Sequence, residues 1–154
     1  MSFRERTAWI AVLTALVVWG YYFSEVWRGY GARALDGQAL WTLFLVCMGV
    51  TVVLMLGINL FVSRRRLKDF GATPDELEKQ LENSAVRITK PLFEWAVLGI
   101  SASALLWGRD FAAGFPADPV GNFAIVMANA LLLAAVATNV LAEIIIIIRF
   151  RALG

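Results

Sequence analysis

The segment NALLLAAVATNVLAEIIIII, residues 129–148, decides the fold class of this chain. Its only charged side chain is Glu143, and a helix of about 20 apolar residues is long enough to cross the hydrocarbon core of a bilayer. Three further blocks are similarly apolar, and together they give predicted spans at about residues 7–27, 39–62, 91–109 and 121–148. The sequence therefore predicts an all-α integral membrane protein, with a single four-helix transmembrane domain over residues 1–154.

The composition of the 154-residue chain supports this class and excludes several others. Hydrophobic residues make up 60% of the chain and the mean hydropathy is +0.70, whereas soluble domains are about 45–50% apolar. The net charge of +2 offers no basic surface for nucleic acid. Histidine is absent and the one cysteine, Cys47, lies in an apolar block, which excludes an intrachain disulfide and histidine-dependent catalysis. We therefore expect no enzyme activity, no metal site and no cofactor.

The distribution of basic residues predicts the orientation of the chain in a membrane. Eleven of the 14 lysines and arginines lie before the first span, in the loop 63–90, or after the fourth span. Loops rich in lysine and arginine stay in the cytoplasm. We therefore expect both termini and the loop 63–90 to be cytoplasmic. Four spans agree with this, because an even number of spans returns the chain to the side on which it started.

The loop 63–90 has a helical pattern of its own. Thr73 and Pro74 are typical of a helix start, with Thr73 as N-cap and Pro74 at the first helical position. One face at helical spacing then carries Leu77, Leu81, Ser84 and Ile88. The dipeptide Lys90-Pro91 is expected to end this helix, because proline disfavours helical geometry in the residue before it. The sequence thus predicts a short cytoplasmic amphipathic helix between the second and third spans.

Two stretches of the chain resemble a known family. FRERTAWI (residues 3–10) opens the chain, and DELEKQLENSAVRI (residues 75–88) precedes the third span. With the four spans and the basic C-terminal end, they resemble a family of small uncharacterised bacterial inner-membrane proteins, a domain of unknown function. The positions that fit are Asp75, Glu76, Glu78, Glu82, Ala85, Arg87 and Ile88, whereas Leu77 stands where the family usually has arginine. The resemblance implies a bacterial inner (plasma) membrane and a four-helix fold, and it brings no catalytic residues.

Four polar residues inside the spans form a candidate intramembrane polar site: Asn59, Glu94, Asn139 and Glu143. Glu143 lies six residues before Arg149, which is about 9 Å along a helix. Asn59 and Glu94 lie at similar distances from basic residues of their own. One stripe of the fourth span is made of Asn129, Leu132, Val136, Asn139 and Glu143. Lipid cannot satisfy polar groups, so we expect this stripe to face protein.

Two interpretations of the polar site remain open. In the first, it is an interhelical hydrogen-bond cluster or an ion pair with Lys90 or Arg149. The chain is then a structural, accessory or regulatory subunit in the bilayer, beside a membrane-protein partner or within a homo-oligomer. In the second, Glu94 and Glu143 hold a proton or cation, since ionisable residues inside a membrane often serve transport. The chain is then a small proton- or cation-coupled transporter or channel. The first is favoured, because both carboxylates lie close to basic residues.

Overall fold

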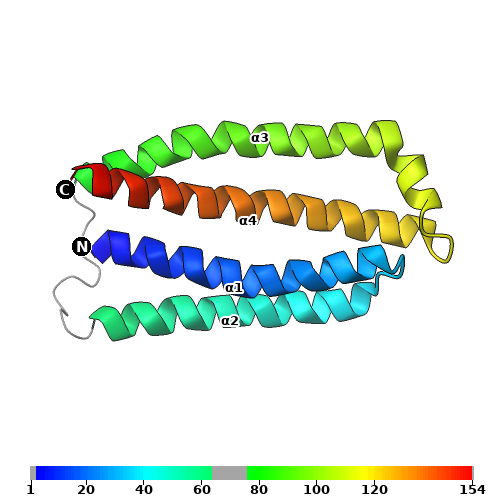
Figure 1. Ribbon diagram of the computed structural model, residues 1–154, viewed down its shortest axis with the longest axis horizontal. Helices are drawn as coiled ribbons and strands as arrows, with labels where there is room; N and C mark the ends of the chain where they lie inside the picture. Colours follow the sequence, from blue (N-terminus) through cyan, green and yellow to red (C-terminus); the bar gives the residue numbers. More distant parts are fainter. Residues whose placement is uncertain (1–2, 64–75, 154) are drawn as a thin grey trace.

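The computed structural model describes residues 3–63 and 76–153, and Figure 1 shows them as four helices. They are α1 (Phe3–Gly31), α2 (Gly37–Ser63), α3 (Glu76–Ala113) and α4 (Pro119–Leu153). Each is long and apolar enough to cross a membrane, by its length and composition. The described residues thus confirm an all-α chain of four span-like helices, which extend beyond the predicted spans at both ends.

The helices lie side by side in the order α3, α4, α1, α2, so α4 and α1 occupy the middle of the row (Figure 1). α4 packs against both α3 and α1, and α2 packs mainly against α1. Both chain ends lie at one end of the row, which we name the termini end. The α1–α2 and α3–α4 connections lie at the opposite end, the connection end. α2 and α3 are therefore edge helices, and many of their large apolar side chains are exposed.

Aspartate side chains fix the starts of α2 and α4. The Asp36 carboxylate accepts hydrogen bonds from the backbone N–H groups of Gln38 (2.9 Å) and Ala39 (3.1 Å). Asp118 accepts one from the N–H of Gly121 (2.9 Å), and a Cβ at position 121 would overlap the Asp118 carboxylate. These N-caps satisfy N–H groups that a helix leaves unpaired in its first turn. The two connections, residues 32–36 and 114–118, therefore each end in an aspartate that fixes where the next helix begins.

The predicted short amphipathic helix is wrong as a separate element. Residues from Glu76 onward form the first turns of α3, and this helix continues through Pro91 without a break. The predicted start at Thr73 and Pro74 lies outside the described residues. Proline removes one intrahelical hydrogen bond and disfavours helix in the residue before it. Other contacts must therefore hold the turns of α3 that precede Pro91.

Packing against the neighbouring helices supplies those contacts. Leu81, Ala85 and Thr89 recur at every fourth residue of α3, and all three are buried. The core cluster at the termini end consists of Ala8 and Val12 of α1, Ala85 of α3, and Ile146 and Ile147 of α4. The buried face of α3 differs from the predicted one, because Ile88 is 42% exposed. Contacts between residues far apart in the sequence thus override the local proline signal.

Polar contacts also join three helices at the termini end. The Arg151 guanidinium of α4 lies 3.6 Å from the Glu5 carboxylate of α1, and it lies over the Trp9 ring, 5.5 Å from its centroid. Arg149 donates a hydrogen bond to the Ser84 hydroxyl of α3. The basic C-terminal end of α4 is therefore attached to both α1 and α3.

Candidate intramembrane polar site

Two of the four predicted site residues, Asn139 and Glu143, line one cavity of about 400 Å³ between α1, α2 and α4. They lie four residues apart on α4, so both point to the same side of the helix. Two hydroxyl side chains share the cavity, Thr14 of α1 and Thr51 of α2. The rest of the lining is small or apolar: Ala11, Ala15, Trp19, Met55, Leu132, Ala135, Val136, Val140 and Ala142. We name this space the Glu143 cavity.

The polar stripe of α4 contacts protein over much of its length. The Tyr22 hydroxyl of α1 donates a hydrogen bond of 2.7 Å to the side-chain oxygen of Asn129. Leu132 and Val136 pack against the buried cluster that contains Trp19. The expectation that this face of α4 meets protein is therefore confirmed from Asn129 to Val136.

Asn139 differs from the rest of the stripe, because its side chain is exposed. It lies between the Glu143 cavity and a smaller cavity of about 290 Å³ on the α3 side, which Thr89 and Lys90 also line. Within residues 3–63 and 76–153, the Asn139 amide has no hydrogen-bond partner. A carboxylate, an amide and two hydroxyls around one cavity can hold either a polar side chain or a cation, because all four present oxygen atoms.

The structure places Glu94 apart from these residues. Its side chain is 59% exposed on α3, and its carboxylate lies 4.0 Å from the Lys90 ammonium one turn earlier. Glu94 is not among the described residues that line the Glu143 cavity. An exposed pair on one helix contributes little to stability. The Glu94–Lys90 contact therefore fits the ion-pair interpretation of this carboxylate better than a shared site with Glu143.

Asn59, the fourth predicted site residue, belongs to α2. Its side chain lies outside the described part of the structure, so its contribution to the site stays a prediction.

Sequence reasoning missed the two threonines of the Glu143 cavity. Thr51 donates a hydrogen bond of 2.8 Å to the Cys47 carbonyl oxygen of its own helix. Threonine commonly bonds its own helix in this way, so a lone threonine in an apolar span gives no signal of a site. The contact of Glu5 with Arg151 was also missed. The sequence did contain a signal for this contact. Four spans bring the two chain ends to the same side, and these ends carry side chains of opposite charge.

Comparisons with known proteins identify no relative of this chain. No protein-family model, no curated protein and no solved structure matches the chain. The family resemblance, which is based on residues 3–10 and 75–88 and on the four-span layout, therefore stays a prediction. Within residues 3–63 and 76–153, no group of three or more histidine, cysteine, aspartate or glutamate side chains could hold a metal ion.

Proposed function

We propose that this chain is an integral membrane protein of four spans and serves as a structural, accessory or regulatory subunit of a membrane assembly. Four helices of suitable length and composition support the membrane placement. The edge helices α2 and α3 support the subunit role, because they present many large apolar side chains outward. Exposed apolar side chains do not distinguish a protein partner from lipid, because lipid covers them equally well. A polar group exposed on the same surface does distinguish the two.

The observation that carries the proposal is the exposed amide of Asn139. It lies ten residues before Arg149, about 15 Å along the helix, and Lys90 of α3 lines the same small cavity. Lipid tails cannot satisfy an exposed amide within the hydrocarbon core. Asparagine side chains form hydrogen bonds between helices inside membranes. A polar group of another polypeptide is therefore expected over Asn139, from a partner protein or from a second copy of this chain.

The proposed orientation places the termini end in the cytoplasm of a bacterial cell, with the helices in its inner membrane. The positive-inside distribution supports the orientation, and the family resemblance supports the bacterial membrane. Single cysteines at Asn83 and Ala117, both exposed positions, test the orientation in a Cys47→Ala chain. In intact cells, a membrane-impermeant thiol reagent should label position 117 and leave position 83 unlabelled. The reverse pattern would overturn the orientation.

Extraction from native membranes in a mild detergent tests the subunit role. The wild-type chain should be recovered with a stable partner or as a defined oligomer, seen by native mass spectrometry. Asn139→Leu should reduce that recovery, because the interhelical hydrogen bond is lost. Leu133→Ala is the matched control, since Leu133 is 50% exposed on another side of α4 and should leave recovery unchanged. A wild-type chain that is always monomeric and alone would contradict the proposal.

A second candidate function is proton- or cation-coupled transport, and the Glu143 cavity favours it. Glu143, Asn139, Thr14 and Thr51 line that cavity together, and an ionisable residue inside a membrane often lies on an ion path. In proteoliposomes, Glu143→Gln should then fold normally and abolish coupled flux, because an amide cannot release a proton. Absence of flux in the wild-type chain, or equal flux in the variant, would reject this candidate.

A further inference from the structure

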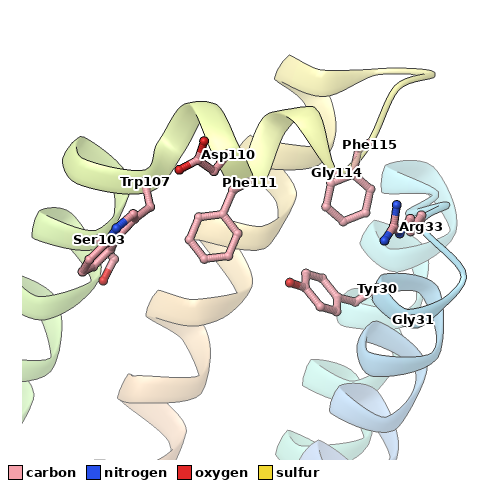
Figure 2. Close-up of a pocket in the computed structure, with 9 residues that line it drawn as sticks. All are labelled: Tyr30, Gly31, Arg33, Ser103, Trp107, Asp110, Phe111, Gly114 and Phe115. Carbon is pink, nitrogen blue, oxygen red and sulfur yellow. The ribbon is translucent and has the colours of Figure 1, made fainter.

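Another cavity lies at the connection end, where the ends of α1 and α3 stand apart in front of α4 (Figure 2). Figure 2 shows Trp107, Asp110 and Phe111 on the α3 side and Tyr30 and Arg33 on the α1 side. The cavity has a volume of about 690 Å³, within the roughly 300–1,000 Å³ typical of small-molecule sites. It shares no described lining residue with the Glu143 cavity, so it is a separate place for a ligand.

Aromatic side chains form much of the wall of this cavity. Tyr30, Trp107, Phe111 and Phe115 line it, and the rings of Tyr30 and Phe115 pack edge to face with centroids 5.7 Å apart. The faces of such rings attract ammonium groups that come within about 6 Å. Aromatic residues also gather at the depth of lipid headgroups, which is where the proposed membrane placement puts the connection end.

Two opposite charges line the same cavity. Arg33 and Asp110 are both exposed, and neither makes an ion pair within residues 3–63 and 76–153. Arg33 lies in the turn after α1 with a left-handed backbone (φ 54°), and its N–H donates a hydrogen bond of 3.1 Å to the Tyr30 carbonyl oxygen. The turn therefore fixes the backbone of Arg33 at the cavity. Figure 2 shows Asp110 on the α3 side and Arg33 on the α1 side, so a ligand that contacts both must carry its positive and negative groups at opposite ends.

The chemistry of these groups selects the ligand. A guanidinium binds phosphate oxygens through paired N–H donors, which suits Arg33. A carboxylate accepts hydrogen bonds from a primary ammonium, which suits Asp110, and the rings of Trp107 and Phe111 add attraction for the same cation. We propose that the connection-end cavity binds a phosphoethanolamine group, with its phosphate at Arg33 and its ammonium at Asp110 beside these two rings.

The face of α3 below the cavity favours a phospholipid, phosphatidylethanolamine, as the source of that group. Ser103 lines the cavity one turn before Trp107, toward the middle of the helix. Gly99 follows one turn further, and apart from its chain neighbours and the nearby backbone of α3, a Cβ there would meet no described atom within 4 Å. An acyl chain can leave the cavity along this open face of α3. The inference rests on the proposed membrane placement, but it does not depend on the subunit role.

Headgroup selectivity of the full-length chain in detergent tests the inference. Native mass spectrometry would compare phosphatidylethanolamine, phosphatidylcholine and phosphatidylglycerol with identical acyl chains. Choline has no N–H to donate to Asp110 and glycerol has no cation, so phosphatidylethanolamine should bind roughly tenfold or more tightly than either. Equal retention of the three lipids by the wild-type chain would overturn the proposal without any variant.

Substitutions of the charged lining residues test whether the selectivity for phosphatidylethanolamine arises from this cavity. Arg33→Gln and Asp110→Asn should each lower the affinity for phosphatidylethanolamine by about tenfold, because each removes one charge-assisted hydrogen bond. Arg109→Gln is the matched control, since Arg109 is exposed beside Asp110 and is not among the described lining residues. Thermal unfolding checks that each variant folds. A folded Asp110→Asn or Arg33→Gln chain with wild-type affinity would overturn the assignment.

Free O-phosphoethanolamine separates the two sources of the ligand group. It should displace the phospholipid only at far higher concentration, because it lacks the acyl chains. Binding as tight as that of the lipid would overturn the lipid source and the acyl path along Gly99. Recovery of the chain in the soluble fraction of cells would instead overturn the membrane placement. A membrane-bound chain without headgroup selectivity would overturn this inference alone.

Discussion

The two ends of the helix row are built differently from similarly apolar sequence. At the termini end, α1, α3 and α4 meet around five buried side chains: Ala8, Val12, Ala85, Ile146 and Ile147. At the connection end, α1 and α3 stand apart around a cavity of about 690 Å³ with a largely aromatic wall. Rings are present at the termini end too, since Trp9 and Phe150 pack against its cluster, so ring size alone does not account for the cavity. The termini end is therefore closed by packed side chains and the connection end is open, although both ends are similarly apolar.

Charged residues follow the same division. At the closed end, Arg151 contacts Glu5 and Arg149 bonds Ser84. At the open end, Arg33 and Asp110 line the cavity without an ion pair among the described residues. The charged contacts of the termini end therefore join helices to one another. The charges that line the connection-end cavity do not, and the Arg28–Glu25 ion pair near that end lies within α1 alone.

The largest effect on stability is expected from breaking the closed end with Ala85→Phe. Ala85 is 1% exposed, and forcing extra volume into a packed core costs about 1–3 kcal/mol. Val86→Phe is the matched control, because Val86 is 54% exposed on the next position of the same helix. Thermal unfolding in detergent, followed by circular dichroism, should show a lower midpoint for Ala85→Phe only. Equal midpoints would contradict the packing of α3 against α1 and α4.

A smaller effect is expected at the connection end, from Asp118→Ala. The Asp118 carboxylate caps the start of α4 through the Gly121 N–H, and loss of an N-cap costs about 1 kcal/mol. Asp118→Asn keeps an oxygen acceptor and should stay within a few tenths of a kcal/mol of wild type. Chemical denaturation of the three chains in detergent measures both differences. If alanine were as stable as asparagine at this position, the turn would not depend on its cap.

The smallest effect is expected between the two ends of the row, from Tyr22→Phe in the buried cluster that contains Trp19. This change removes the hydroxyl that donates to Asn129, and hydrogen bonds between membrane helices average about 0.6 kcal/mol. Tyr21→Phe is the control, because Tyr21 is 58% exposed. The difference in unfolding midpoint between the two variants measures the bond. A larger loss in Tyr21→Phe than in Tyr22→Phe would contradict the described contact of α1 with α4.

Local composition was enough to predict most of the helical structure. The predicted span 39–62 and the observed α2, Gly37–Ser63, nearly coincide, because a span depends only on a window of about 20 residues. The break expected at Lys90-Pro91 did not occur. It was outweighed by contacts of Ala85 with residues of α1 and α4 far away in the sequence, and a local rule does not contain such contacts.

Of the candidate site, the sequence could predict only the part that depends on spacing within one helix. Asn139 and Glu143 share a cavity because a spacing of four residues places them on one side of α4. The side to which Glu94 turns depends on the rotation of α3 against its neighbour, which helical period alone does not fix. The cavity beside Tyr30 and Trp107 depends on the order of the helices in the row, and this order is a property of the tertiary structure.

Cross-linking from position 139 in native membranes tests the central proposal most directly, namely that another polypeptide covers Asn139. A photoactivatable thiol reagent would be attached to Asn139→Cys or, as control, to Leu133→Cys, each in a Cys47→Ala chain. The account predicts a discrete protein adduct from position 139 and mainly lipid adducts from position 133, where the native side chain faces outward. Lipid adducts alone from both positions would contradict it. Rapid labelling of position 139 by a membrane-impermeant thiol reagent would contradict it as well, because the cavity would then be open to water.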